Sequence, residues 1–392
     1  MAAVDPATSA DLALPQDFVA HAGRAGLRDS DDVAIVVSRR PCASAGLFTQ
    51  NLFAGPSVTL SRPRATGGHA RAVVVVAHNA NVANGPQGVA DAREVSARAA
   101  RAAGVADEEV VVASTGVIGR PYPMPLLRAY LDGLGAGSFG AGAVAVARAM
   151  MTTDTVAKVA EQRVGPARLV GVAKGVGMIE PDMATMLAFV FTDAEVSPAA
   201  LAPAWRRAVD HTLNCLSVDT DTSTSDSAVV LANGAAGPVE AGAFAAALGQ
   251  VCLDLTLQLA RDGEGATKLL TVTVRRARDR GQARRVAKSI VNSPLVKAAV
   301  HGADPNWGRV VMAIGKCQGD TDIDPERVVV CFGDIEVYPA RPLPAVLDDL
   351  RAQMGKDHVG IDVQLCTGQA EVTAYGCDLS AGYVRINADY TT

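Results

Sequence analysis

The most reactive chemistry in the sequence is predicted in the stretch 175–187, which reads Gly-Val-Gly-Met-Ile-Glu-Pro-Asp-Met-Ala-Thr-Met-Leu. Its two glycines allow backbone angles that other residues avoid, and Pro181 fixes φ and removes a donor, so a strand ladder cannot simply continue. Ala184 then precedes Thr185, a hydroxyl residue that opens an apolar run. Such a turn can hold a peptide bond under strain beside a hydroxyl that attacks it. An ordinary β-turn between two strands is the simpler interpretation of the spacing alone.

Further polar motifs lie at the predicted ends of strands and helices. The standard catalytic patterns fail, because the sequence has no P-loop, GxSxG, SxxK or HExxH motif. The polar motifs that remain therefore carry the search for a site. They are STGVIG (114–119), MTTDT (151–155), DTDTSTSD (219–226), DGEG (262–265), GADPNWGR (302–309) and INADYTT (386–392).

Two of these motifs imitate known kinds of site. The stretch 219–226 begins like a calcium-binding loop, but Thr224 replaces the needed glycine and Val230 the closing glutamate. We interpret it as a structural loop of Asx and Ser/Thr turns. His301 and Asp304 have the residue types of a base and its orienter. Because none of the six histidines is paired at ligand spacing, a structural role is the better interpretation.

Hydrophobic patterns predict the elements that must position these motifs. Helices are expected at 91–103, closed by Gly104, at 142–151, at 197–216 with Ser197 as N-cap and Pro198 at N1, and at 244–259. Strands and helices mix without the regular alternation of a doubly wound fold, so the predicted class is layered α/β, with sheets covered by helices. Strands are expected at 32–38, 71–77, 109–113, 167–173, 186–191, 227–231, 270–275, 327–332, 359–365, 371–375 and 382–387.

Composition limits the class of protein. A chain of 392 residues has room for two or three domain-sized units, and its net charge of −5 without a basic block argues against nucleic acid and membrane partners. Seven scattered cysteines without a CxxC pair favour a reducing compartment over a disulfide framework or a zinc site. Asp5 and Asp11 stand where a signal peptide needs a basic start, and no apolar run is expected to reach the ~18 residues of a membrane span. We predict a soluble, cytoplasmic protein.

Together the motifs resemble, in the same order and over nearly the whole chain, those of the ornithine acetyltransferase family. The longest match is AKGVGMIEPDMATML (173–187). The family catalyses glutamate N-acetylation and acetyl transfer from N-acetylornithine in arginine biosynthesis. Its members are self-cleaving N-terminal-nucleophile enzymes, and their fold is an αββα-type sandwich with a smaller second α/β domain. Glu180 and Asp182, where neutral residues are usual, make the chain most similar to the branch associated with clavulanic-acid gene clusters.

The resemblance implies a cut between Ala184 and Thr185, which gives an alpha fragment, 1–184, and a beta fragment, 185–392. Thr185 is then the nucleophile, and its own α-amine is the base, because a reference pKa of roughly 7.7–8.0 suits work near neutrality. The implied oxyanion donors are the Thr115 side chain and the Gly116 N–H. The implied substrate-binding residues are Thr152, Lys174, Thr185, Glu264, Asn387 and Thr392.

The resemblance implies N-acetylornithine and glutamate as partners, no cofactor or metal, and two copies of each fragment. Because a free amino acid carries opposite charges on adjacent groups, we assign Lys174 to a substrate carboxylate and Glu264, placed at the end of a helix, to a substrate ammonium. From the residues alone, these two read as a solvated surface pair. The alternative function is an amide hydrolase or aminopeptidase on the same self-cleaving scaffold, where water accepts the acyl group. A non-catalytic relative is disfavoured, because the nucleophile and the oxyanion donors are all present.

Overall fold

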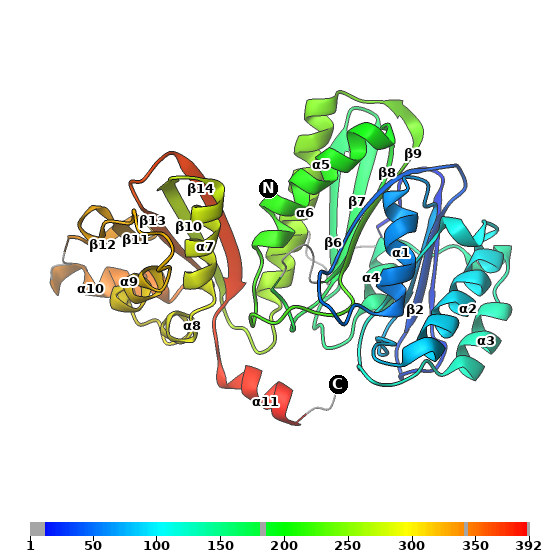
Figure 1. Ribbon diagram of the computed structural model, residues 1–392, viewed down its shortest axis with the longest axis horizontal. Coiled ribbons are helices and arrows are strands. Elements are labelled where there is room, and N and C mark those ends of the chain that lie inside the picture. The colour runs from blue at the N-terminus through cyan, green and yellow to red at the C-terminus, as the bar shows by residue number, and fades with distance from the viewer. Residues whose placement is uncertain (1–11, 181–185, 341–343, 390–392) are drawn as a thin grey trace.

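The computed structural model describes residues 12–180, 186–340 and 344–389. Figure 1 shows a larger unit that is built around two sheets, a smaller unit with its own sheet, and a last helix that runs back toward the larger unit. We call these units the larger and the smaller domain. The prediction of a second, smaller α/β domain is therefore confirmed.

The first sheet of the larger domain has the strand order β1-β2-β4-β5. Three of its strands, β2, β4 and β5, are rich in valine and buried on both faces, as strands covered on both sides should be. The strands are β1 (Phe18–Gly23), β2 (Val33–Ser38), β4 (Ala72–Val76) and β5 (Val110–Ser114).

The second sheet has the order β3-β9-β8-β7-β6. Within it β7 and β8 pair antiparallel, whereas β8 and β9 pair parallel. The 175–187 stretch therefore joins two strands that are direct neighbours. The strands are β3 (Ala43–Phe48), β6 (Lys158–Val164), β7 (Ala167–Lys174), β8 (Leu187–Glu195) and β9 (Ser227–Pro238).

Helices cover both sheets on the outside. The pair α2 (Gly85–Ala103) and α3 (Met124–Asp132) packs on the first sheet, and α5 (Pro198–His211) and α6 (Ala241–Arg261) pack on the second. The predicted αββα sandwich is thus confirmed. It has one addition, because α1 (Pro56–Thr66) and α4 (Ala143–Met150) lie between the sheets and share their interior.

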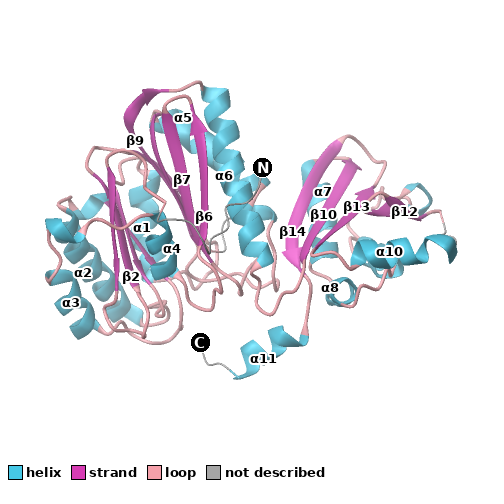
Figure 2. Cartoon of the chain, turned by 180° about the vertical axis from the view of Figure 1, so that it is seen from behind, coloured by secondary structure: helices cyan, strands magenta, loops and turns pink. Residues whose placement is uncertain are grey.

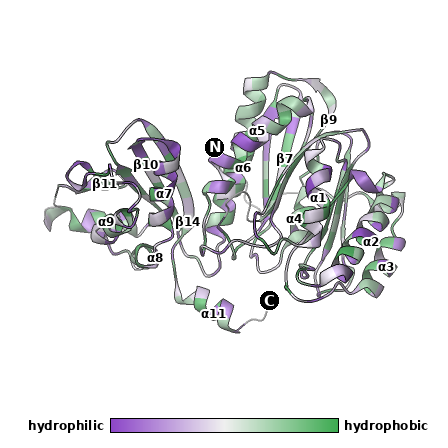
Figure 3. Cartoon of the chain, viewed as in Figure 1, coloured by the Kyte–Doolittle hydropathy of each residue, from purple (hydrophilic) through white to green (hydrophobic). Residues whose placement is uncertain are grey.

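The two sheets also touch directly. The rings of Phe18 on β1 and Phe191 on β8 have their centroids 5.4 Å apart. Figure 3 shows the hydrophobic colouring concentrated on the strands and on the helix faces turned toward them. This interior is filled mostly by alanine and valine, with Phe18, Phe48, Phe189 and Phe191 as its aromatic side chains.

Helix ends follow their sequence signals, although some boundaries shift. The Ser197 side chain accepts from the Ala200 N–H at the start of α5, and Gly104 closes α2 in the left-handed conformation with φ of 69°. Helix α2 begins earlier than predicted, at Gly85. Helix α5 ends at His211, and a short 3₁₀ helix, Leu213–Cys215, follows it where a continuous helix was predicted.

Helix α6 corrects one expectation from composition. With 21 residues and a mean hydropathy of 1.4, it is long and apolar enough to cross a membrane by those two criteria. Half of its apolar window is buried, and Phe244, Leu248 and Leu255 lie in the core beside the second sheet. Packing within the larger domain therefore accounts for its apolar character.

The smaller domain carries a five-stranded sheet in the order β12-β11-β13-β10-β14. Its helices are α7 (Arg280–Val291), α8 (Pro294–His301), α9 (Trp307–Gly315) and α10 (Leu347–Met354), and they share one core with the sheet. Strand β10 is half-exposed as predicted, since Val272 and Val274 are buried and Thr273 is not. The strands are β10 (Leu269–Ala277), β11 (Val329–Phe332), β12 (Ile335–Tyr338), β13 (His358–Gln364) and β14 (Ala370–Cys377).

The prediction of a strand at 382–387 was wrong, because this segment lies in helix α11 (Ala381–Asp389). Its alternation of apolar and polar residues does not reflect burial, since Val384 is 64% exposed and Ile386 37%. The Ser380 hydroxyl accepts from the Gly382 N–H near the helix start, which is a turn signal that the strand prediction overlooked. Figure 2 shows α11 from behind, extending away from the smaller domain.

Candidate active site

A cavity of about 140 Å³ opens where the connecting loops of both sheets meet. The first sheet contributes His78 after β4 and the STGVIG turn after β5. The second sheet contributes the end of β7, the residue before β8 and the loop that leads into β9. The residues that line the cavity include Arg28, His78, Thr115, Gly116, Thr152, Thr153, Lys174, Met186, Thr224, Ser225, Asp226, Glu264 and Asn387.

The STGVIG turn is held closely against the loop after β4. Gly116 has φ of 122°, and a Cβ at this position would lie 2.3 Å from the carbonyl carbon of His78. Only glycine fits there, because both the angle and the space exclude a side chain. The Thr115 N–H donates to the Val76 carbonyl at 3.1 Å, which continues the strand and sets the hydroxyl at the cavity wall.

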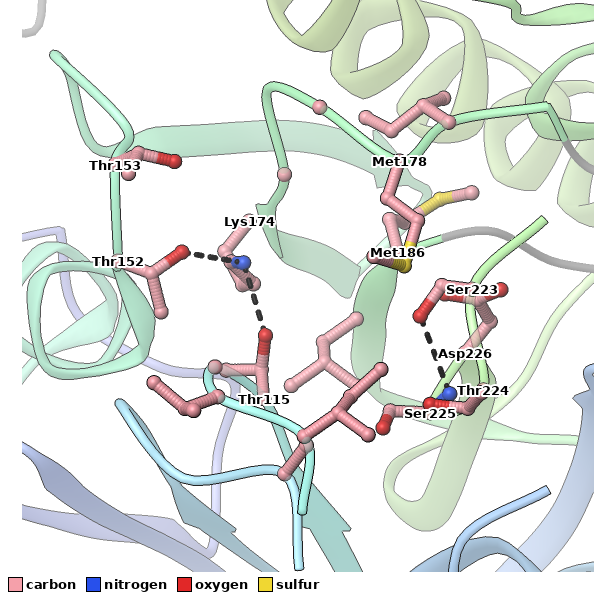
Figure 4. Close-up of a pocket in the computed structure, with 18 of the residues that line it drawn as sticks. Thr115, Thr152, Thr153, Lys174, Met178, Met186, Ser223, Thr224, Ser225 and Asp226 are labelled. Carbon is pink, nitrogen blue, oxygen red and sulfur yellow. Dashed lines mark hydrogen bonds between the residues drawn. The ribbon is translucent and has the colours of Figure 1, made fainter. Parts of the chain in front are cut away.

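Lys174 is the buried cation of the cavity and is only 8% exposed. Its ammonium donates to Thr115 Oγ1 at 3.0 Å and to Thr152 Oγ1 at 2.8 Å, as Figure 4 shows. Asp154 Oδ2 lies 3.9 Å from the same nitrogen. The interpretation of Lys174 and Glu264 as a solvated surface pair is therefore wrong, because the Lys174 ammonium binds hydroxyls and faces Asp154 inside the protein.

Asp154 is the centre of a group of charges that we call the buried charge cluster: Asp154, Lys158, Lys174 and Asp262. The Lys158 ammonium is fully buried and donates to Asp154 Oδ1 at 2.7 Å and to Asp262 Oδ2 at 2.6 Å. Asp262 also accepts from the Thr155 N–H at 3.0 Å. Two cations thus meet two carboxylates away from water.

The cluster shifts the ionisation of its members in opposite ways. Burial alone would raise the pKa of Asp154, but attraction to Lys174 and Lys158 and hydrogen bonds from Lys158 and the Gly175 N–H lower it to about 2. Burial lowers the pKa of Lys174, and the Asp154 carboxylate is the largest influence that opposes this effect. Asp154 is therefore a carboxylate at neutral pH, and it favours the charged form of Lys174.

Glu264 lies three residues beyond the end of α6, so the prediction that it ends a helix was wrong by one short turn. Its backbone N–H donates to the Val176 carbonyl at 2.8 Å, which fixes it beside the residues that follow β7. Its carboxylate accepts from Thr153 Oγ1 at 3.0 Å and from Asn387 Nδ2 at 2.8 Å. Glu264 thus ties the C-terminal helix to the cavity.

The wall formed by Thr224, Ser225 and Asp226 was not singled out as a site by the sequence. All three side chains are buried, and among the described residues Thr224 Oγ1, Ser225 Oγ and Asp226 Oδ2 have no hydrogen-bond partner. Burial raises the pKa of Asp226 well above its usual range. The stretch 219–226 was predicted to be a structural loop, and this holds for Asp219, which accepts from the N–H groups of Met178 at 2.7 Å and Ile179 at 2.8 Å. It does not hold for the last three residues of the stretch, which line the cavity.

Three residues named from the sequence, Ala184, Thr185 and Thr392, lie outside the described residues, as does Asp182. Met186, which follows Thr185 in the chain, lines the cavity next to Lys174 and the Thr224–Asp226 wall.

The other predicted site residues fall into two groups: residues that line the cavity and residues that lie elsewhere. Thr115, Gly116, Thr152, Lys174, Glu264 and Asn387 line one cavity although they are far apart in the chain. His301 bonds Asp378 Oδ2 at 2.7 Å and, like Asp304, does not line that cavity, which supports a structural role for this histidine.

Other candidate groups can also be placed from the structure. Glu180 accepts from Ser217 Oγ at 3.1 Å and from Asn292, so it braces the loop after β7 toward the smaller domain. No group of three His, Cys, Asp or Glu side chains gathers as a metal site within 12–180, 186–340 and 344–389.

This arrangement is suited to acyl transfer. The Thr115 hydroxyl accepts a hydrogen bond from Lys174, so its own proton remains available to a negatively charged oxygen in the cavity. The Gly116 turn brings backbone close to the same space, as an oxyanion site requires. Buried hydroxyls, a cation and a carboxylate surround a space of small-molecule size.

Comparison with known proteins assigns the chain to a family. The sequence model of the ArgJ family matches residues 19–392. The arginine biosynthesis bifunctional protein ArgJ 2 of Nostoc sp. is 53% identical over 379 residues, which cover 96% of this chain and 98% of that protein. The glutamate N-acetyltransferase Oat2 of Streptomyces clavuligerus is 52% identical over 385 residues, with coverage of 96% and 98%. A crystal structure of ArgJ from Bacillus halodurans aligns with a TM-score of 0.49 at 40% identity, over 53% of this chain and 100% of that one.

Proposed function

The chain belongs to the ArgJ family and is an acyltransferase, and on that premise we propose that it moves an acetyl group from N-acetyl-L-ornithine to L-glutamate. The observation that carries the proposal is the cavity itself, where Thr115, Gly116 and Lys174 surround the space next to Met186. The residue before Met186 in the chain is Thr185, the proposed nucleophile.

The proposed reaction has two halves. The Thr185 hydroxyl attacks the acetyl carbonyl and passes its proton to the Thr185 α-amine, and the carbonyl oxygen becomes an oxyanion stabilised by Thr115 and Gly116. The C–N bond then breaks, the α-ammonium returns its proton to the leaving nitrogen, and ornithine departs. The neutral amine of glutamate then attacks the acetyl-Thr185 ester through the same oxyanion site and passes a proton to the Thr185 α-amine. The ester C–O bond breaks, the α-ammonium returns that proton to the Thr185 oxygen, and N-acetylglutamate leaves.

The polar groups around the cavity support the proposed contacts with an amino acid. Lys174 gives two of its three N–H donors to hydroxyls, and we assign the third to a substrate carboxylate. Glu264 is assigned to a substrate ammonium, and Thr152, Asn387 and Thr392 complete the proposed contacts. Asn387 reaches this position because α11 is tied to Glu264.

The active form is proposed to arise by a cut between Ala184 and Thr185, which frees the α-amine needed as base. The products are the fragments 1–184 and 185–392, and we propose that two of each assemble. The seven cysteines are all free thiols in the structure, which supports the proposed cytoplasmic location.

The alternative, an amide hydrolase on the same scaffold, is disfavoured because the ArgJ relatives are named for arginine biosynthesis and glutamate N-acetylation. A product assay with N-acetylornithine, with and without glutamate, tests the proposal. We expect N-acetylglutamate to form in proportion to ornithine release. Release of acetate at the same rate with and without glutamate would instead identify a hydrolase.

A further inference from the structure

Asp154 carries no role in the proposed chemistry, yet its carboxylate contacts the residue that follows Lys174 and a residue that binds the Lys174 ammonium. Its Oδ1 accepts from the Gly175 N–H at 2.7 Å, and its Oδ2 accepts from the Thr152 N–H at 3.1 Å. Gly175 follows Lys174 in the chain, and Thr152 receives one of the hydrogen bonds of Lys174. One buried carboxylate therefore fixes the backbone that presents the ammonium and the backbone of one of its acceptors.

The charges that face Lys174 come from several elements. Asp154 lies in the loop after α4, Lys158 on β6, Asp226 before β9, Glu264 after α6 and His78 after β4. The Asp154 carboxylate lies 3.9 Å from the Lys174 ammonium, and Asp226 is held toward its neutral form by burial. Asp154 is therefore the carboxylate best placed to balance the charge of Lys174.

We propose that Asp154 is a positioning residue that keeps Lys174 protonated and aimed at Thr115 Oγ1, so that Lys174 strengthens the Thr115 hydroxyl as an oxyanion donor. A hydroxyl that accepts from a cation becomes a stronger donor, because each hydrogen bond polarises the next. The inference rests on the proposed function, since it requires an oxyanion at Thr115.

The proposal predicts a specific pH dependence. Burial already lowers the pKa of Lys174, and the Asp154 carboxylate opposes that effect. Without this carboxylate the pKa of Lys174 falls further, and Lys174 loses its proton at a lower pH. Neutral Lys174 polarises Thr115 weakly, so activity declines as the pH rises through the pKa of Lys174.

The experiment is the pH profile of kcat for acetyl transfer from pH 5.5 to 10, measured on protein whose maturation is verified by intact mass. In Asp154→Asn we expect the descending limb to lie at lower pH than in wild type by one pH unit or more. At pH values above the pKa that sets this limb, the rate should fall roughly tenfold per pH unit. Asp262→Asn is the matched control, because it removes the other carboxylate that bonds Lys158, on a side chain that is 7% exposed, and its limb should stay where it is in wild type.

A second variant keeps the proposal testable if Asp154→Asn does not mature. Arginine stays protonated throughout this pH range, so Lys174→Arg should transfer acetyl groups without the descending limb. A limb unchanged in Lys174→Arg, a uniform loss in Asp154→Asn at every pH, or equal shifts in Asp154→Asn and Asp262→Asn would each overturn the proposal. Failure of the proposed function looks different, because wild type would then form no N-acetylglutamate at any pH.

Discussion

The two domains place their charges in contrasting ways. In the larger domain the buried charge cluster brings Lys158, with a fully buried side chain, against Asp154 and Asp262 beside the cavity. In the smaller domain Arg275 binds Asp362 at 2.7 Å and Glu371 at 2.5 Å, and these three side chains are between 39% and 49% exposed. The hydrogen-bond distances are similar in both places, whereas the access to water is not.

Of these two sets of charges, the set whose burial is unfavourable is the one beside the cavity. Removing charges from water costs several kcal/mol per ion, and attraction offsets this only while every partner is present. Exposed pairs gain little and lose little, because water and salt screen them. The buried charge cluster lies beside the groups proposed to act on the substrate, so we infer that it is kept for its effect on the site.

Among substitutions at the cavity, Thr185→Ala should have the largest effect. Without the hydroxyl there is no nucleophile, so the chain should remain a single uncut polypeptide and transfer no acetyl groups. Intact-mass analysis and the product assay check both statements. An uncut wild type that is fully active would contradict the proposed maturation.

Lys158→Met tests the buried charge cluster directly. Loss of one member from a buried charge cluster leaves uncompensated charge, so the variant should lose about 3–5 kcal/mol of stability. Urea unfolding in the Thr185→Ala background measures this on one continuous chain. A loss below about 1 kcal/mol would show that water reaches the cluster.

Thr115→Ala removes a cavity hydroxyl while leaving all four charges of the buried charge cluster in place. The rate of acetyl transfer should fall by about 10²–10³-fold, because one oxyanion donor is lost. The measurement is kcat with N-acetylornithine and glutamate on matured protein. An unchanged rate would make the STGVIG turn a purely structural corner.

Acid should weaken the buried charge cluster through Asp154. Its pKa falls from 3.8 to about 2 on folding, and a carboxylate with a lowered pKa stabilises the fold above its unfolded pKa. This contribution, about 2 kcal/mol, should be present above about pH 4 and disappear as the pH falls toward 2. Unfolding midpoints from pH 5 to 2 should therefore fall less steeply in Asp154→Asn than in the parent chain.

The smallest effect is expected in the smaller domain. Arg275→Met removes pairs with Asp362 and Glu371 in which every side chain is exposed to water, so stability should change by about 0–1 kcal/mol. Urea midpoints in the same Thr185→Ala background allow direct comparison with Lys158→Met. Losses of similar size in the two variants would remove the distinction between the domains.

The sequence predicted the residues that line the cavity better than it predicted the buried charged residues behind them. Thr115, Lys174 and Glu264 could be named because their motifs resemble those of a family and lie at the ends of apolar runs. Lys158 and Asp262 could not, because a lysine and an aspartate at strand or helix ends are solvated in most proteins. Only the packing of β6 against α6 buries them, and that contact is not visible in a linear pattern.

The fold was predictable to a similar degree. Valine-rich runs such as 71–77 can hardly be anything but buried strands, and Ser197 with Pro198 marks a helix start. Segments whose side chains stay outside the core were harder to predict, and 382–387 is an example. There Val384 and Ile386 alternate with polar residues without packing in the core, so a local hydrogen bond at Ser380 decided the structure.

The strand order of the second sheet has a consequence for the matured protein. In β3-β9-β8-β7-β6, strands β8 and β9 follow the proposed cut, and they lie between β3 on one side and β7 and β6 on the other. The two fragments would therefore interleave within one sheet and share two ladders. After complete denaturation, folding of the cut protein becomes an encounter of two molecules whose rate depends on concentration, whereas the uncut chain folds alone. Cleavage would thus make assembly a step that the protein performs reliably only once, while its two halves are still joined.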